Sequence, residues 1–206
     1  GDYFQDIGEF AVVGVDPDYL SRTWRLVGLL VDRDFGLAAW QPGWLLVVPA
    51  LAALLGTSRR GTGPPGITGL VLPLLAGWLV ATFLALTMHG WWWPGRQTVV
   101  VLPLALLVVL CWLARTSPAV RAAGGALGLA GVGTYAALLL DGHAGKIVWV
   151  NGYTQVHSPT YQALRPLLPA YGNEIGHLGW VVVLGLVAVA AGSAARPRAA
   201  AAEALR

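Results

Sequence analysis

Five long apolar segments constrain this chain more than any other feature of its sequence. A helix that crosses a bilayer core of about 30 Å needs roughly 20 apolar residues. The five segments reach or approach that length: Leu37–Leu55, Ile67–Met88, Thr98–Ala114, Ala122–Leu140 and Leu178–Gly192. Only 11% of the residues are charged, against roughly a quarter in a typical soluble domain. We therefore expect an all-α fold, a polytopic membrane helix bundle with about five transmembrane helices and an ordered extracytoplasmic loop.

The charge and the cysteine content exclude several other classes of protein. The formal net charge is only +3 and is spread over several loops, so nothing predicts nucleic-acid binding. Cys111 is the single cysteine, which excludes a disulfide within the chain and fits a small residue that fills space in an apolar run. The sequence leaves the oligomeric state open.

The fourth apolar segment contains an unusual number of glycines. Gly124 and Gly128 are four residues apart, a spacing that lets two helices in a membrane approach closely. We therefore expect this segment to pack against neighbouring helices and not against lipid.

The distribution of basic residues predicts a cytoplasmic C-terminus. Segments 56–65, 115–121 and 193–206 carry seven basic residues in 31 positions, whereas segments 1–34, 89–96 and 141–176 carry six in 78. Loops rich in arginine and lysine face the cytoplasm. The sequence is thus divided into an extracytoplasmic segment 1–34, a transmembrane domain 35–192 with an outer loop 141–176, and a cytoplasmic tail 193–206.

The extracytoplasmic segment is polar at first and then amphipathic. Apolar residues recur near helical spacing between Tyr19 and Val31, which predicts an amphipathic helix lying along the membrane interface. The chain begins with Gly1, and no signal peptide follows it. We therefore expect the chain to begin inside a larger protein.

A tryptophan-rich turn separates the second and third apolar segments. Trp91, Trp92 and Trp93 are typical of a membrane–water boundary, and Pro94-Gly95 ends any helix that precedes it. Arg96 follows with a permanent charge and five N–H donors, which suit a phosphate or a carboxylate. The alternative is that Arg96 only reaches lipid headgroups from the end of the third segment.

Two further clusters fall on the predicted outer face. Asp32 and Asp34 flank Arg33 just before the first apolar segment; they either form a local ion pair with that arginine or orient a sugar hydroxyl or a metal. In the outer loop, Ile147–Val150 predicts a short strand, and Tyr153 and His157 follow it.

The four histidines, His89, His143, His157 and His177, also map to this face. Glu174 and His177 would share one face of a helix. No spacing of these residues matches a metal signature, so no metal ligand is assigned. The sequence indicates no cofactor, and a divalent cation remains an open alternative.

Several of these segments together resemble large bacterial membrane proteins related to the GT-C glycosyltransferases. The resemblance covers about residues 28–175 and rests on short motifs: Leu29–Leu37 followed by Pro42, the turn Trp92–Arg96, Leu102–Leu104, Pro159–Tyr161 and Pro166–Tyr171. It implies transfer of a sugar from a polyprenyl-phosphate donor at the outer face of a bacterial inner membrane. Asp32 and Asp34 do not match the catalytic position of that family, and the region that usually holds its catalytic acid is not recognised in this chain.

The leading interpretation is therefore the C-terminal membrane portion of a GT-C-like glycosyltransferase, with membrane lipids and a polyprenyl-phosphate-linked sugar donor as partners. Arg96 would contact the donor phosphate, while Trp91–Trp93 and Tyr153 would shape the sugar or lipid pocket. The alternatives are a transporter or flippase for lipid-linked intermediates and a non-catalytic membrane scaffold subunit.

Overall fold

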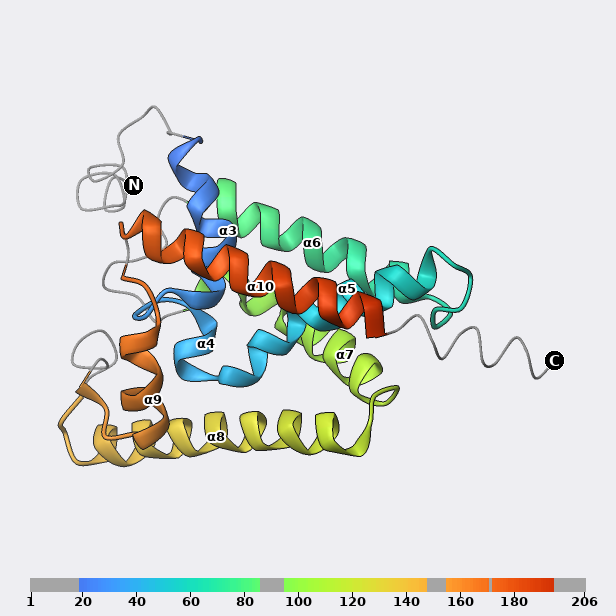
Figure 1. Ribbon diagram of the computed structural model, residues 1–206. Coiled ribbons are helices and arrows are strands. Elements are labelled where there is room, and N and C mark those ends of the chain that lie inside the picture. Colours follow the sequence, from blue (N-terminus) through green and yellow to red (C-terminus); the bar gives the residue numbers. More distant parts are fainter. Residues whose placement is uncertain (1–18, 86–94, 148–154, 171, 195–206) are drawn as a thin grey trace, which may run out of the picture.

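The computed structural model describes residues 19–85, 95–147, 155–170 and 172–194, and these residues form helices without a strand. Three short helical segments precede the first long helix: η1 (Ser21–Trp24), α3 (Arg25–Val31) and α4 (Leu37–Trp40). The main helices are η2 (Pro42–Leu46) with α5 (Val47–Ser58), α6 (Ile67–Phe83), η3 (Arg96–Val101) with α7 (Leu102–Leu113), α8 (Pro118–His143) and α10 (Glu174–Ala194). Between α8 and α10 lie α9 (Pro159–Leu164) and η5 (Arg165–Leu167) (Figure 1).

Among the described residues, three helices are long and apolar enough to cross a membrane. They are Arg96–Leu113, Pro118–His143 and Glu174–Ser193, while Pro42–Ser58 and Ile67–Phe83 are apolar but shorter. The all-helical architecture of a membrane protein is thus confirmed in outline. The expected strand at Ile147–Val150 falls mostly on residues 148–150, which lie outside the described residues.

The first predicted span is not one continuous helix. Helix α4 ends at Trp40, and Gln41 takes an extended conformation with φ −139° and ψ 90°. Pro42 then restarts the chain as a 3-10 helix, because its ring fixes φ and it has no N–H to donate. The Gln41 side chain accepts a hydrogen bond from the Gly43 N–H at 3.4 Å, which stabilises this new start.

The second predicted span also ends early, because two arginines cap its last turn. Nη1 of Arg22 donates to the carbonyl oxygen of Phe83 at 2.5 Å, and Nη1 of Arg25 donates to that of Ala85 at 2.6 Å. Phe83 is the last residue of α6 and Ala85 follows the helix, so neither carbonyl has a partner within α6. Residues 86–88, the remainder of the predicted span, lie outside the described residues.

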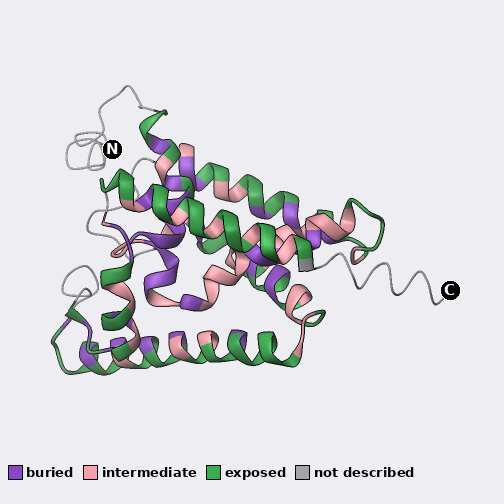
Figure 2. Cartoon of the chain, in the orientation of Figure 1, coloured by how far each residue is buried: buried purple, intermediate pink, exposed green. Residues whose placement is uncertain are grey.

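A bundle of four helices forms the body of the structure. Helix α5 packs between α10 and α7, and α6 packs against α7 (Figure 1). The core that α5, α6 and α7 share is aliphatic and includes Ala50, Leu54, Val71, Leu74 and Val108. The outward faces of α8 and α10 are mostly exposed (Figure 2), as expected of helices that meet lipid or another chain.

Helix α8 lies along one side of this bundle and contacts it through a narrow stripe. The buried residues of the helix are Gly124, Gly131, Thr134, Leu138 and Asp141. The Gln41 side chain occupies the space beside Gly131 and leaves no room for a Cβ, and Gly124 lies against Leu113. A Cβ at Gly128 would meet no atom within 4 Å. The expected packing of α8 against neighbouring helices is therefore limited to this stripe within the described residues, and its separation from lipid stays a prediction.

The predicted amphipathic helix over residues 19–31 is present as η1 followed by α3, but it does not leave one face open. Six of its last seven residues are buried, including Val27, Leu29 and Val31. Helix α3 contacts α4, α6 and α10, and it is largely buried in Figure 2. The segment is thus an inserted part of the fold, and its depth in a membrane stays a prediction.

The chain alternates between two ends of the structure. One end, here called the arginine end, holds residues 56–66 and 114–121 together with the last turn of α10 (Figure 1). Its charged residues are Arg59, Arg60, Arg115 and Arg121, with no acid among them. The opposite end, here called the polar end, holds residues 19–36, 83–85, 95–98, 141–147, 155–170 and 172–177. Within the described residues, the loops predicted to be cytoplasmic therefore lie at the arginine end, and those predicted to be extracytoplasmic lie at the polar end.

Candidate functional site

Four of the eight predicted site residues lie in the described part of the chain: Asp32, Asp34, Arg96 and His157. The others, Trp91, Trp92, Trp93 and Tyr153, lie outside the described residues. The four that are described all belong to the polar end, but they divide between two sets of contacts.

Asp32 organises the turn between α3 and α4. Its Oδ1 accepts hydrogen bonds from the backbone N–H groups of Asp34 and Phe35, at 2.9 and 2.8 Å. The carbonyl of the same residue accepts the N–H of Gly36 at 3.0 Å. Aspartate favours such a turn, because its short side chain can accept the N–H groups that a backbone carbonyl would otherwise accept. Asp32 is therefore the centre of the turn that carries Asp34.

The carboxyl group of Asp32 is fully buried, with 0% of the residue exposed. Within the part of the chain that the structure describes, its Oδ2 has no hydrogen-bond partner. Burial raises the pKa of this carboxyl above its usual value, because desolvation disfavours the charged form, although the two amide hydrogen bonds and the nearby His177 lower it. The Asp32 side chain thus does not reach solvent, and it acts on any ligand through the turn.

The two acids do not form an ion pair with the arginine between them. Nε of Arg33 donates to the carbonyl oxygen of Leu168 at 3.1 Å, and its backbone N–H donates to that of Pro169 at 2.9 Å. Asp34 instead binds Arg165, whose Nη2 and Nε lie 3.2 and 3.3 Å from its Oδ1. The expected local ion pair is thus replaced by a clamp between the first turn and the last outer loop.

Arg165 keeps its charge in this clamp. Burial lowers the pKa of its guanidinium, but the Tyr161 and Asp34 side chains raise it by more, so the net pKa lies above the usual value. The ion pair is only partly exposed, with side-chain exposures of 39% for Arg165 and 27% for Asp34. A permanent cation therefore lies at the polar end, and one acid neutralises it.

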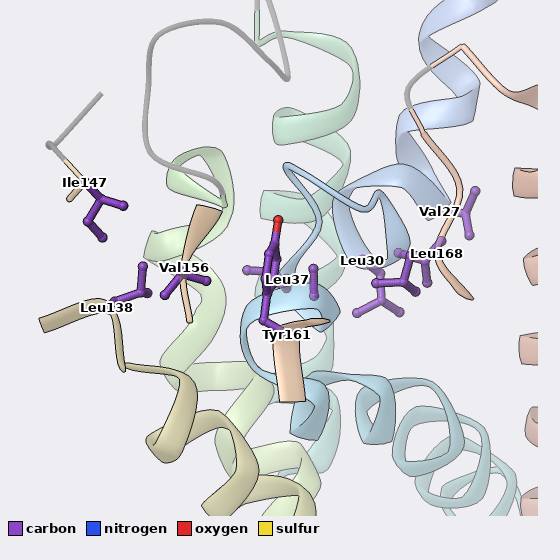
Figure 3. Packing of buried hydrophobic residues seen from close by; sticks show 10 residues of the cluster. Val27, Leu30, Leu37, Leu138, Ile147, Val156, Tyr161 and Leu168 are labelled. Carbon is purple, nitrogen blue, oxygen red and sulfur yellow. The ribbon is translucent and has the colours of Figure 1, made fainter. Parts of the chain in front are cut away.

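Tyr161 joins this clamp to the core of the polar end. The residue is fully buried, and its ring stacks on Trp40 with centroids 4.4 Å apart. Figure 3 shows the ring between Val156 and the pair Leu30 and Leu168. Nε1 of Trp40 donates to the carbonyl oxygen of Asp34 at 3.2 Å. Sequence reasoning missed Trp40, Tyr161 and Arg165 as site residues, and only their aromatic or charged character at the edge of apolar runs signals them.

Arg96 begins η3 close to the same turn. Gly95 precedes it with φ +76°, a left-handed conformation that favours glycine. A Cβ at position 95 would lie 2.6 Å from Cδ2 of Leu37, so the backbone before Arg96 packs against the first residue of α4. Arg96 itself is half-buried. The structure therefore places the backbone just before Arg96 against Leu37, three residues after Asp34.

His157 belongs to a separate set of contacts at the end of α8. Its backbone N–H donates to Oδ2 of Asp141 at 2.7 Å, and its Nδ1 lies 3.1 Å from both carboxylate oxygens. Nζ of Lys146 lies 3.6 Å from Oδ1 of the same acid. Asp141 thus fastens the segment that returns from α8 to α9, and the exposed His157 ring faces away from the core.

The metal alternative gains no support from the residues that the structure describes. Within them, no group of three histidine, cysteine, aspartate or glutamate side chains is close enough to share an ion. The polar end is instead built from paired charges: Asp34 with Arg165, and Asp141 with His157 and Lys146.

No protein-family model matches the chain, and no significant match is found among curated proteins or among solved structures. The function therefore has to be argued from the geometry of the polar end and from the expectation set by the sequence motifs.

Proposed function

We propose that this chain is the membrane portion of a glycosyltransferase that moves a sugar from a polyprenyl-phosphate donor to an acceptor at the outer membrane face. The observation that supports it most is the position of Arg96, half-buried at the start of η3 and directly after Gly95, which packs against Leu37. A guanidinium binds phosphate oxygens through two parallel N–H bonds. A cation at the mouth of an apolar bundle suits a phosphate attached to a lipid.

The other residues of the proposed site have supporting roles. Arg96 contacts the donor phosphate and stabilises the charge that develops as the sugar departs. Trp91–Trp93 and Tyr153 shape the pocket for the sugar or the lipid. Asp32 and Asp34 hold the turn and its clamp to Arg165, which keeps the floor of the site in place. We assign no catalytic base to this chain.

We further propose that five helices cross a bacterial inner membrane, with the polar end outside and the C-terminus in the cytoplasm. The two shorter apolar helices, Pro42–Ser58 and Ile67–Phe83, lie in the same bundle as the longer ones. The arginine end carries only basic residues, which fits the cytoplasmic side.

This orientation predicts opposite labelling at the two ends of α8. Single cysteines replace Ala119 and Ala144, both exposed, in a chain whose Cys111 is changed to alanine. A maleimide that cannot cross membranes is expected to label Ala144→Cys in intact cells and Ala119→Cys only after permeabilisation. The reverse pattern would overturn the topology, and labelling of both positions in intact cells would show that α8 does not span.

The phosphate contact predicts a loss of transfer when Arg96 is replaced. Arg96→Ala is expected to slow transfer roughly 10- to 100-fold, because a hydrogen bond to a charged group contributes about 1.5–3 kcal/mol. The transfer rate of Arg96→Lys should lie between those of the wild type and Arg96→Ala, since lysine keeps the charge but not the paired donors. The assay measures transfer from a radiolabelled polyprenyl-phosphate sugar by the full-length protein in membranes.

Arg121→Ala at the arginine end is the matched control for this assay, because it removes an exposed arginine far from the polar end. It should transfer as wild type. Wild-type transfer by Arg96→Ala, at equal amounts of folded protein, would rule out the phosphate contact.

A non-catalytic scaffold subunit is the second candidate. It is favoured by the internal pairing of the acids at the polar end, where Asp34 and Asp141 already bind Arg165, His157 and Lys146. A scaffold would show no transfer by the wild-type protein with any polyprenyl-phosphate sugar. The same assay therefore separates the two candidates before any variant is made.

A further inference from the structure

An aspartate–histidine pair lies where the chain returns from α8 to α9 at the polar end. Both carboxylate oxygens of Asp141 lie 3.1 Å from Nδ1 of His157. A carboxylate can only accept hydrogen bonds, so Nδ1 carries a proton and donates it. Nε2 of the neutral ring then holds a lone pair. The two side chains are thus arranged as a base and the carboxylate that orients it.

The two residues of this pair differ in how far they reach solvent. The side chain of Asp141 is 7% exposed, whereas that of His157 is 68% exposed. Among the residues that the structure describes, the hydrogen bonds of His157 involve its backbone N–H and Nδ1, and none involves Nε2. The lone pair of Nε2 is therefore open to a ligand at the polar end, while the carboxylate lies behind the ring.

The backbone around His157 is fixed without the help of its ring. Val156 and Ser158, the two neighbours of His157 in sequence, are 0% and 1% exposed. Oγ of Ser158 lies 2.9 Å from Oγ1 of Thr134 on α8. The N–H of His157 also donates to Oδ2 of Asp141 at 2.7 Å. These contacts fasten the segment to α8, so the exposed ring is left for another role.

The apolar core of the polar end connects this pair to the proposed donor site. Val156 belongs to the same buried cluster as Leu37, and both side chains are drawn in Figure 3. Leu37 in turn packs against Gly95, the residue before Arg96. One cluster of buried side chains therefore supports both His157 and the start of η3.

The described residues of the proposed donor site do not supply a base. A hydroxyl acceptor is a weak nucleophile until a base takes its proton in the transition state. Arg96 cannot be deprotonated in a protein and has no acceptor atom. Asp32 is fully buried, and Asp34 is paired with Arg165. Nε2 of His157 is exposed and can accept a proton, so it fits the role that these groups leave open.

We propose that His157 is the general base of the sugar transfer, with Asp141 as its positioning residue and a hydroxyl of the acceptor as the group it deprotonates. The acceptor oxygen bonds to the anomeric carbon of the sugar while the bond from that carbon to the phosphate oxygen breaks. The electron pair of the broken bond stays on the polyprenyl phosphate, and the hydroxyl proton moves to Nε2. His157 later releases this proton to water. This inference rests on the proposed function.

The other charged and titratable groups around the pair are few among the described residues. Nζ of Lys146 lies 3.6 Å from Oδ1 of Asp141 and neutralises part of its charge. On the side of α9 and η5, Arg165 binds Asp34. His143 lies two residues after Asp141, is exposed and has no carboxylate partner among the described residues. It is therefore a histidine of the same end of α8 without the group that orients His157.

The test measures kcat and the donor KM of the full-length protein in membranes as a function of pH. Tritiated undecaprenyl-phosphate glucose, mannose and galactose are the donors, and octyl glucoside and octyl mannoside are the hydroxyl acceptors. The wild-type kcat is expected to fall as the pH decreases from roughly 8 to 5, the range in which an imidazole gains a proton. A base must be unprotonated to act, so this fall reports the base.

Two variants assign the roles. His157→Ala keeps the backbone N–H that Asp141 accepts, so it should fold as wild type. Its kcat should be roughly 100-fold lower or less, without the fall at low pH and with an unchanged donor KM, because general base catalysis contributes about 10²–10⁴-fold. Asp141→Asn can donate to Nδ1 and so favours the opposite tautomer. Its kcat should fall roughly tenfold or more at an unchanged donor KM.

His143→Ala is the matched control and should keep the wild-type kcat and pH profile. If His157→Ala also keeps them while the wild type transfers sugar, the base is overturned and the proposed function stands. A His157→Ala variant that is slow but keeps the fall at low pH overturns the base as well. Absence of transfer by the wild type from all three donors overturns the base together with the proposed function.

Discussion

Replacing Gly36 by alanine is expected to lower the Tm of this protein by roughly 6–12 °C, which corresponds to about 3 kcal/mol in a chain of this size. A Cβ at this position would lie against the backbone nitrogen of Asp32, 2.6 Å from its carbonyl oxygen and 2.9 Å from that of Leu30. All three atoms belong to the backbone, so no side-chain rotation relieves the contact. Overpacking with side-chain neighbours alone costs about 1–3 kcal/mol.

The control for this prediction is Gly133→Ala on the exposed face of α8. A Cβ there meets no atom within 4 Å, and alanine is a better helix former than glycine by roughly 0.5–1 kcal/mol. The control should keep or raise the Tm. Both variants are followed by thermal unfolding in detergent with fluorescence-detected size-exclusion chromatography. A Gly36→Ala protein within about 2 °C of wild type would contradict the described turn.

The architecture could be predicted from the sequence because apolar length and loop charge are both local properties. The runs Thr98–Ala114, Ala122–Leu140 and Leu178–Gly192 correspond to the three helices long enough to span. Their loops separate into an arginine end and a polar end as the count of basic residues suggested. Such features need no knowledge of which segments touch.

The breaks inside the apolar runs were harder to predict. Gln41 and Pro42 lie in a run that hydropathy reads as continuous, yet the helix ends before them and restarts after them. The Gln41 side chain reaches α8, where its Nε2 lies 3.4 Å from the carbonyl oxygen of Gly128. A polar residue in an apolar run is tolerated when a neighbouring helix supplies its partner. Hydropathy alone does not reveal that partner.

The candidate site shows the same limit. Asp32 and Asp34 are recognisable in sequence as charged residues at a span boundary, but their partners are not. Arg165 is 131 residues away from Asp34 in the chain, and a periodicity argument cannot connect them. His157 and Asp141 are only 16 residues apart, but no sequence pattern shows that the chain returns to bring them into contact. Local patterns therefore located the polar end and missed its pairings.

The pairings also change what the predicted site can mean. Because Asp34 neutralises Arg165 and Asp32 is buried, neither acid offers a free carboxylate in the way that the sequence suggested. Their effect on a donor would pass through the turn and through Leu37, which packs against the Gly95 that precedes Arg96. A substitution in the turn that leaves the fold intact should therefore change transfer less than Arg96→Ala does.

Two substitutions of Asp32, to alanine and to asparagine, are expected to differ strongly in their effect on the free energy of unfolding. Asp32→Ala removes the acceptor of two backbone N–H groups, those of Asp34 and Phe35, in a place closed to water. An unsatisfied buried donor costs about 1–3 kcal/mol, so the alanine variant should lose roughly 2–5 kcal/mol in total. Asp32→Asn keeps an oxygen for both N–H groups and carries no charge, so at neutral pH it should stay within about 1 kcal/mol of wild type.

The two proteins should differ in their response to pH. Burial raises the folded-state pKa of Asp32 above the value of 3.8 that it has when unfolded, so the folded state binds the proton more tightly. The stability that this group contributes is complete below pH 3.8 and is lost as the pH rises through the folded pKa. The asparagine side chain does not titrate, so Asp32→Asn does not lose this stability. Its Tm relative to that of the wild type should therefore increase as the pH rises from 3.8 through the folded-state pKa of Asp32.

Asp34→Asn is the control for both measurements, because Asp34 is partly exposed and its ion pair with Arg165 is expected to contribute at most about 1 kcal/mol. Unfolding in detergent at a series of pH values from 3.8 upward gives the Tm of each variant. If the Tm difference between Asp32→Asn and wild type does not change over this range, the buried charge of Asp32 does not limit the stability of the fold. If Asp32→Ala is as stable as Asp32→Asn, the two amide hydrogen bonds do not hold the turn.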